Sequence, residues 1–169
     1  MMENMNTQVY RSGVVATPAQ RGVEAGSFLA ADAVKPAGRQ GRSTAIFASP
    51  SLRGVLRWLY SNTTITSVAD PFVKELKVNP DTVWVYDITA WEKASSTETY
   101  EPYWESGMTL TEWLANADQL DPAEWELLLG ADDIVSIKPV SDKRALSYLR
   151  EDDLFFEALP RALKDARRK

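Results

Sequence analysis

The chain has 169 residues, a formal net charge of −5, and neither histidine nor cysteine. The absence of cysteine excludes disulfides and thiolate nucleophiles, and the absence of histidine excludes the Ser-His-Asp triad and the commonest general base. Its apolar residues make up 44%, so the length predicts a single domain with a substantial core. Any catalysis must therefore depend on carboxylates, hydroxyls, Arg, Lys, Tyr or a bound cofactor.

The N-terminal segment predicts a flexible leader over residues 1–7 and a strand over Gln8–Arg11, ended by the turn pair Ser12-Gly13. Met1–Tyr10 lacks the apolar stretch of a signal peptide, and no apolar run reaches about 18 residues. We therefore expect a cytoplasmic protein without a membrane partner.

Residues 16–43 are rich in Ala, Gly, Pro and Arg, which predicts a long loop with at most one short helix near the apolar stretch Ser27–Ala31. Thr44–Ala48 is a strand candidate. A helix is expected directly after it, with Ser49 as N-cap and Pro50 in the first turn. The helix would carry one apolar stripe and end near Asn62; the stripe comprises Leu52, Val55, Leu56 and Leu59.

The middle of the chain predicts strands over residues 72–78 and 83–88, followed by a polar, acidic and aromatic loop over residues 92–108. Thr109 and Glu112 have the spacing of a capping box, so a short helix should begin there. Its apolar side would be formed by Leu110, Trp113, Leu114 and Ala117.

Two apolar segments, Leu127–Leu129 and Ile134–Ile137, follow with a turn at Gly130, and residues 142–149 predict a short helix. Residues 159–169 predict a basic tail or frayed helix, which leaves residues 8–158 as the domain. Short strands interrupted by short helices indicate an α+β fold. The sequence has neither a Rossmann fingerprint nor a P-loop.

Charge is distributed unevenly. Residues 11–57 hold seven basic and two acidic side chains, whereas residues 92–133 hold eleven acidic side chains and Lys93 alone among basic ones. The first segment would attract phosphate and the second a cationic partner, unless both are simply solvated faces.

Three separated motifs carry side chains suited to chemistry. Arg11 ends a predicted strand, Phe47-Ala48-Ser49-Pro50-Ser51 ends another with paired hydroxyls, and Glu124-Trp125-Glu126 precedes an aliphatic run. If the third motif is a strand, its two carboxylates lie on one face, where they repel unless positive charge lies between them. Asp121-Pro122 is equally a helix-start pattern, and a helix would separate the two glutamates by about 200°.

In this order, the three motifs resemble those of the Arg–Ser–Glu class of mono-ADP-ribosyltransferases, over roughly residues 9–140. The resemblance implies a core of two small packed, mostly antiparallel β-sheets with flanking short helices. It also implies that Glu124–Leu129 is a strand, that residues 83–88 form the central strand, and that residues 105–123 form a target-recognising loop with a short helix.

The resemblance implies NAD as a substrate, with no metal. Glu126 would be the catalytic glutamate that accepts a hydrogen bond from the ribose, Ser49 would orient it, and Glu124 would assist a target arginine. Arg11 would bind the NAD phosphates or hold the adjacent backbone, and the other NAD-binding residues would be Ser12, Gly13, Phe28, Phe47 and Ser51. The chain departs from the family in Pro50, where a hydroxyl is usual, and in Ser12, which separates Arg11 from Gly13. Phe28 and Phe47 are equally well explained as core residues.

The implied reaction is transfer of ADP-ribose from NAD to an arginine of a protein. Cleavage of the nicotinamide–ribose bond builds an oxocarbenium-like cation, which a fixed carboxylate stabilises without histidine. By analogy, a small chain of this kind suits a phage-encoded or bacterial effector that acts in a host cytoplasm. We expect no nucleic-acid contact outside residues 161–169. The alternatives are a non-enzymatic binding or inhibitor module with a degenerate transferase fold, and an NAD glycohydrolase without a protein target.

Overall fold

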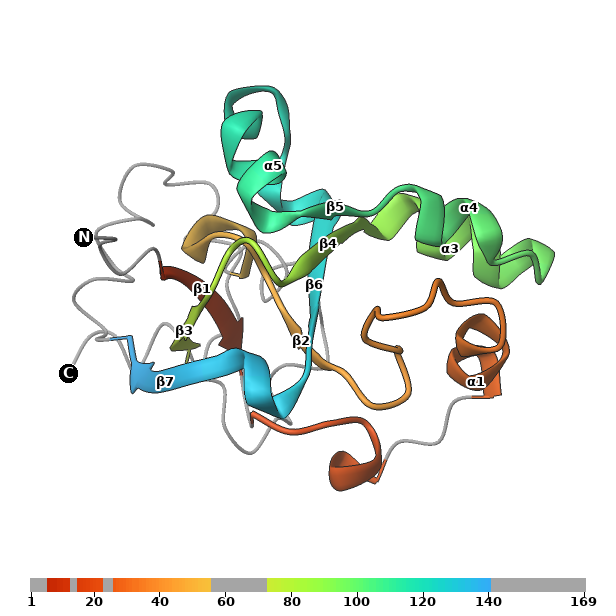
Figure 1. Ribbon diagram of the computed structural model, residues 1–169, viewed down its shortest axis with the longest axis horizontal. Coiled ribbons are helices and arrows are strands. Elements are labelled where there is room, and N and C mark those ends of the chain that lie inside the picture. The colour runs from red at the N-terminus through yellow and green to blue at the C-terminus, as the bar shows by residue number, and fades with distance from the viewer. Residues whose placement is uncertain (1–5, 13–14, 23–25, 56–72, 141–169) are drawn as a thin grey trace, which may run out of the picture.

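The computed structural model describes residues 6–12, 15–22, 26–55 and 73–140. The predicted positions Gly13 and Asn62, the helix over residues 142–149 and the tail over residues 159–169 lie outside these ranges. Figure 1 shows the described elements, from β1 to β7. Among them, no helix has the length and apolarity needed to cross a membrane.

Two antiparallel sheets form the frame of the molecule. The three-stranded sheet has the order β1-β3-β7, formed by Thr7–Ser12, Val73–Val78 and Ile134–Pro139. The four-stranded sheet has the order β2-β6-β4-β5, formed by Ile46–Ala48, Trp125–Leu129, Trp84–Asp87 and Met108–Thr109.

The α+β class is confirmed, and each predicted strand is present with changed bounds. β1 begins at Thr7 rather than Gln8, β2 lacks Thr44 and Ala45, and Ile88 begins the helix α3 instead of ending a strand. The strand expected to be central, β4, is one of the two inner strands of its sheet, and β6 is the other.

The sheets meet where β1 and β2 end. Tyr10 and Ser49 form an isolated antiparallel bridge, in which the Tyr10 N–H donates to the Ser49 carbonyl at 2.9 Å and the Ser49 N–H donates to the Tyr10 carbonyl at 2.7 Å. This bridge places the strand that carries Arg11 beside the turn that carries Ser49.

Strand β6 is the central element of the four-stranded sheet, paired with β2 on one side and β4 on the other. Because side chains alternate along a strand, Leu127 and Leu129 enter one buried cluster with Val9, while Leu128 enters a second cluster with Tyr86. A strand covered on both faces has no solvent side, which explains the uninterrupted apolar run. The same alternation puts Glu126 on the face of Leu128.

Helices cover that second face. Segment 92–108 was expected to be a loop, and this is wrong: it belongs largely to α3 (Ile88–Thr97) and α4 (Glu101–Glu105). The carboxylate of Asp87 caps α3 by accepting the Thr89 N–H at 2.8 Å. Aromatic side chains among the acidic residues supply the buried side, since Tyr103 and Trp104 of α4 are fully or almost fully buried. Burial of these rings stabilises the helices, although the polar composition of the segment had predicted a loop.

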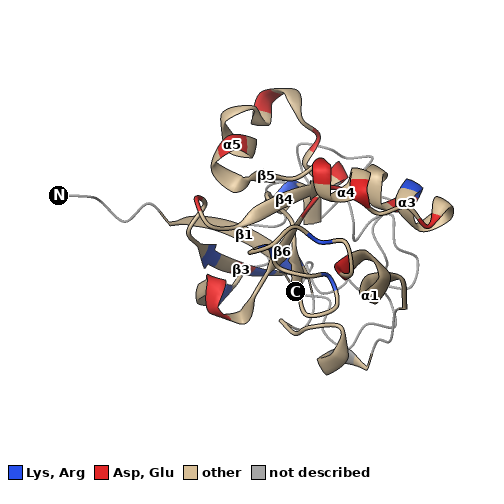
Figure 2. Cartoon of the chain, turned by 45° about the vertical axis from the view of Figure 1, so that its right-hand side comes forward, with Lys and Arg blue, Asp and Glu red and all other residues tan. Residues whose placement is uncertain are grey.

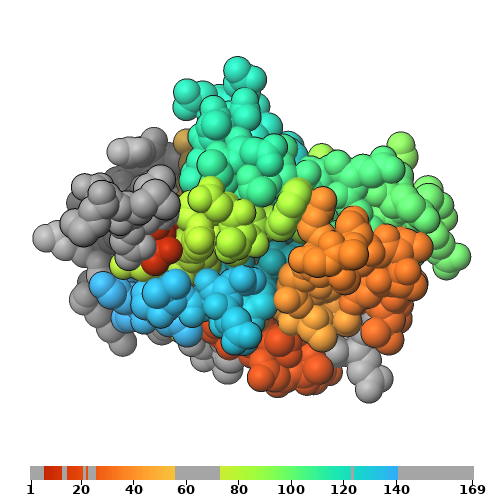
Figure 3. All heavy atoms as spheres, viewed as in Figure 1, coloured from red at the N-terminus to blue at the C-terminus, as the bar shows by residue number. Residues whose placement is uncertain are grey.

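The segment before β2 crosses the same face. It contains one 3₁₀ turn, η1 (Ala19–Arg21), and one short helix, α1 (Gly26–Asp32), as predicted for a long connection. The Trp104 Nε1–H donates to the Ala31 carbonyl at 2.9 Å, which fastens α1 to α4. Figure 3 shows this segment in orange lying against the green surface of α3 and α4.

The predicted capping box is present at the start of α5 (Leu110–Ala115). The Thr109 side chain accepts the Glu112 N–H, and the Glu112 side chain accepts the Thr109 N–H. Leu110 and Trp113 bury the inner side of the helix, whereas Leu114 remains exposed. Three 3₁₀ turns complete the described chain: η3 (Ala117–Gln119), η4 (Pro122–Glu124) and η5 (Ala131–Asp133).

We expect Thr109→Ala to lower the free energy of unfolding by about 1 kcal/mol, because the Glu112 N–H at the start of α5 loses its side-chain acceptor. Ser95→Ala is the matched control, since Ser95 is an exposed hydroxyl within α3 and should change stability by less than about 0.5 kcal/mol. Urea unfolding measures both variants. Equal stability of the two would contradict a stabilising cap.

Candidate active site

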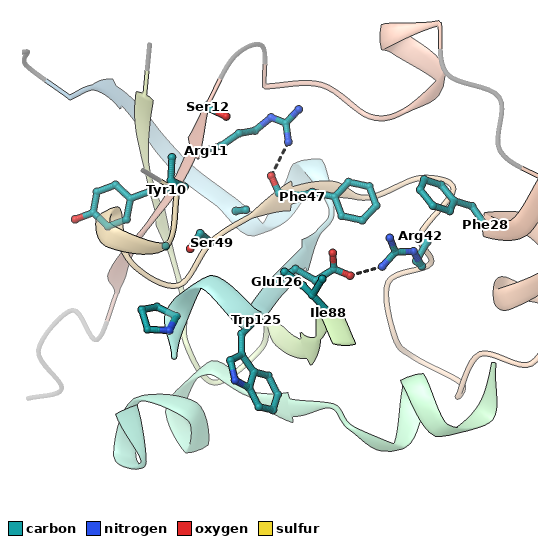
Figure 4. Close-up of a pocket in the computed structure, with 14 residues that line it drawn as sticks. Tyr10, Arg11, Ser12, Phe28, Arg42, Phe47, Ser49, Ile88, Trp125 and Glu126 are labelled. Atoms are coloured by element: carbon teal, nitrogen blue, oxygen red, sulfur yellow. Dashed lines mark hydrogen bonds and ion pairs between the residues drawn. The ribbon is translucent and has the colours of Figure 1, made fainter. Parts of the chain in front are cut away.

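A cavity of about 400 Å³ opens beside the junction of the two sheets. This volume lies within the range of small-molecule sites. Its wall contains six of the nine residues predicted for the site, contributed by β1, α1, β2 with its following turn, and β6 (Figure 4): Arg11, Ser12, Phe28, Phe47, Ser49 and Glu126. Arg11, Ser49 and Glu126 represent three motifs that lie far apart in the sequence.

Arg11 lies near the end of β1 and reaches across to β2. Its Nη1 donates to the Phe47 carbonyl at 2.7 Å. The guanidinium therefore holds the backbone of the second motif, which is one of the two roles that the resemblance implies. Ser12 follows it at the cavity wall.

Ser49 belongs to the sheet junction rather than to a helix cap. Its backbone is used in the bridge to Tyr10, so the helix cannot begin there, and the predicted start is wrong. Residues 52–55 are helical, and the Ser51 Oγ accepts the Gly54 N–H at 3.0 Å as their cap. The structure thus places Ser51 at the helix start, outside the cavity lining. The Ser49 Oγ donates to the Ser51 carbonyl at 3.1 Å.

The Glu-x-Glu motif was predicted either to form a strand or to follow a helix start, and each of these is present in part. Asp121-Pro122 starts only the single 3₁₀ turn η4, whose last residue is Glu124, and β6 begins at Trp125. The strand implied by the resemblance is present without its first residue. Glu124 is exposed and does not line the cavity, so the two glutamates do not share the cavity wall.

Glu126 lies on the cavity wall with 14% of its side chain exposed. Its Oε2 accepts hydrogen bonds from Arg42 Nη1 and from the Tyr103 hydroxyl, the latter at 2.7 Å. Burial, with the negative charge of Glu126, raises the pKa of Tyr103 well above its usual value, although Arg42 opposes this shift. Tyr103 is therefore a neutral donor at physiological pH.

Arg42, which sequence reasoning did not single out, is the buried cation of the site. Its side chain is 4% exposed and forms the ion pair with Glu126. Four rings, which we call the aromatic cage, surround the guanidinium. The distances from Cζ to the ring centroids are 3.7 Å for Trp91, 4.7 Å for Phe28, 4.9 Å for Phe47 and 5.1 Å for Tyr103. Such contacts stabilise a cation that has lost its hydration.

The sequence offered little to identify these residues. The only signal for Arg42 was the excess of basic side chains in residues 11–57, which six other residues share. Because residues 92–108 were expected to form a loop, nothing in the sequence placed Tyr103 beside Glu126 or Trp91 beside Arg42. Correct prediction of α3 and α4 would have been needed to find them.

Comparison of the chain with known proteins found no relative. No family model, no curated protein and no solved structure matches this chain. Among the residues that the structure describes, no group of three or more carboxylates is placed to hold a metal ion.

Gly54 sets the distance between the helix over residues 52–55 and the rest of the site. A Cβ at this position would lie 2.7 Å from the Pro122 carbonyl oxygen and closer still to the Ser49 Oγ. The backbone before β6 therefore packs directly on the turn that carries Ser49.

We expect Gly54→Ala to lower the free energy of unfolding by about 1–3 kcal/mol, because the methyl group meets a backbone carbonyl that cannot move alone. Gly26→Ala is the matched control: a Cβ there meets nothing within 4 Å, and the expected change is neutral or stabilising by up to about 1 kcal/mol. Thermal and urea unfolding measure both. Stability of Gly54→Ala equal to that of the unsubstituted chain would show that no close approach exists.

Proposed function

We propose that this protein is an NAD-dependent mono-ADP-ribosyltransferase that modifies arginine on a protein. The observation that carries the proposal is the meeting of Arg11, Ser49 and Glu126 at one cavity. These residues come from β1, from the turn after β2 and from β6, and the family resemblance rests on the same three motifs. Two small antiparallel sheets with short helices agree with the expected architecture.

The chemistry suits a carboxylate that is ionised and held in place. The bond between the ribose C1′ and the nicotinamide nitrogen breaks, and its electron pair neutralises the charged pyridinium ring. Nicotinamide then leaves without needing a proton. Glu126 stabilises the positive charge that develops on the ribose, in the manner of the carboxylates of glycosidases. A nitrogen of the target guanidinium forms the new bond to C1′ and loses one proton to solvent or to a nearby base.

Arg11 and Ser49 define the other side of the cavity. Arg11 keeps β2 beside β1 through the Phe47 carbonyl, which preserves the shape of the cavity wall against which nicotinamide would lie. Ser49 lines the same cavity, and its hydroxyl donates to the Ser51 carbonyl at 3.1 Å rather than to Glu126. Binding groups placed on strands hold a substrate more accurately than groups on free loops.

The surface beyond the cavity supports a cationic target. Acidic side chains are exposed along α3, α4 and α5 and on the turns that lead to β6 (Figure 2); they include Glu92, Glu98, Glu101, Glu105, Glu112, Asp118 and Glu124. A negative surface of this kind favours approach of a basic protein segment. Glu124 is the member nearest in sequence to Glu126.

We expect Glu126→Gln to reduce nicotinamide release from NAD by a factor of about 10² or more, because the neutral amide stabilises the ribose cation poorly. NAD binding, measured by calorimetry, should be retained. The assay uses adenylate-labelled NAD, purified protein and a bacterial lysate, and reads free nicotinamide and labelled protein separately.

Two further variants keep this test decisive. Glu105→Gln removes one exposed acidic group of α4, outside the cavity lining, and should leave nicotinamide release unchanged. Glu126→Asp retains the charge next to Arg42, so it tests the position of the carboxylate if the Gln variant is poorly folded. Unchanged NAD cleavage in folded Glu126→Gln would refute the proposal. NAD binding without cleavage by the unsubstituted chain would favour the binding-module alternative.

We expect Glu124→Gln to abolish labelling of protein while nicotinamide release to water continues at a rate within about threefold of the unsubstituted rate. The reason is that Glu124 is exposed outside the cavity, where it would contact the target and not NAD. Parallel measurement of labelled protein and free ADP-ribose checks this. Equal loss of both products would assign Glu124 to NAD cleavage, and free ADP-ribose as the sole product of the unsubstituted chain would identify a glycohydrolase.

A further inference from the structure

We propose that Arg42 is the positioning residue of the site: it binds one oxygen of the Glu126 carboxylate and thereby directs the other oxygen to NAD. This inference rests on the proposed function. It assigns a role in catalysis to a residue that none of the three motifs contains.

The two carboxylate oxygens of Glu126 have different surroundings. Oε2 accepts both Arg42 Nη1 and the Tyr103 hydroxyl, whereas Oε1 makes no hydrogen bond to any residue that the structure describes. Figure 4 shows the second oxygen turned away from Arg42. Because Arg42 Nη1 also donates to the Tyr103 hydroxyl at 2.7 Å, the three groups form a closed triangle that fixes the carboxylate plane.

Arg42 is not available to bind the NAD phosphates. Its guanidinium is almost wholly buried in the aromatic cage, and its backbone is also held: the Asp32 carboxylate accepts the N–H groups of Arg42 at 2.7 Å and of Ser43 at 3.1 Å. Moving the side chain into the cavity would take the guanidinium out of the aromatic cage and leave the mostly buried carboxylate of Glu126 without its counterion. Its charge therefore acts on Glu126.

The ion pair has two effects on a carboxylate that is mostly buried. A neighbouring cation favours the ionised form, which is the form that stabilises a ribose cation. The paired hydrogen bonds also remove rotational freedom, so no reorganisation is needed when charge develops. The same cation also weakens the negative potential of the carboxylate, which would lower kcat. A raised kcat in an Arg42 variant would show that this opposing effect is the larger one.

Few other titratable groups face Glu126. Tyr103 of α4 is neutral because burial raises its pKa. Tyr86 of β4 is paired with Glu126 in the strand register, and burial raises its pKa as well, although Arg39 opposes that shift. Arg11 of β1 lines the same cavity and contacts the Phe47 carbonyl. Arg42 and Tyr103 are therefore the side chains that hold the Glu126 carboxylate.

The test compares Arg42→Met with Arg39→Met by measuring kcat and KM for NAD at neutral pH. Arg39 is the matched control, since it also lies on an aromatic ring, 3.4 Å from the Trp84 centroid, and donates to the Tyr86 hydroxyl, but is not among the residues that line the cavity. In Arg42→Met kcat should fall about tenfold or more while KM for NAD changes by less than about threefold, because the carboxylate is no longer held in the position that the reaction needs. Arg39→Met should keep both constants.

Arg42→Lys provides the second variant if the Met variant does not fold. It keeps the charge without the planar fork, so kcat should fall about tenfold while KM for NAD changes by less than about threefold.

Three results would overturn the inference: an unchanged kcat in folded Arg42→Met, a raised kcat in that variant, or a Lys variant with raised KM and unchanged kcat. Each leaves the proposed function intact, because the unsubstituted chain still cleaves NAD. An unsubstituted chain without NAD cleavage would overturn both.

Discussion

The structure depends on the covering of both faces of β6. With β2 and β4 on its two sides, this strand has no exposed edge and no exposed face along Leu127–Leu129. One face closes the core that includes β1 and β3, and the other requires a second layer of cover. α3, α4 and the segment that contains α1 supply this cover, so their arrangement follows from the strand that they bury.

The same constraint determines the electrostatics of the site. Alternation places Glu126 on the face that the aromatic residues cover, near the end of the strand where the core opens into the cavity. A carboxylate in that position needs a partner that remains charged after desolvation. Arg42 is such a partner, and its own burial is compensated by rings rather than by water. The aromatic cage thus stabilises the cation, and the cation stabilises the carboxylate.

The sequence predicted the strands and the α5 capping box well, because these depend on alternation and on contacts three residues apart. Arg11, Ser49 and Glu126 were found as members of motifs, and the structure places them at one cavity. The sequence did not predict α3 and α4, whose acidic residues conceal a buried aromatic side, nor the helix start at residue 52, which the pairing of Ser49 with Tyr10 displaces. Arg42 could not be predicted, since its partners lie on elements that only the tertiary fold brings together.

The Arg42–Glu126 ion pair joins residues 84 positions apart in the chain. A ribosome synthesises Arg42, and most of the rings that surround it, well before it adds the carboxylate that neutralises it. An N-terminal fragment that includes Arg42 but stops short of residue 126 would contain this arginine without its counterion. Contacts of such long range close a large loop and are entropically demanding. The site therefore cannot exist in a nascent chain that lacks β6, and its completion coincides with insertion of the strand that completes the sheet.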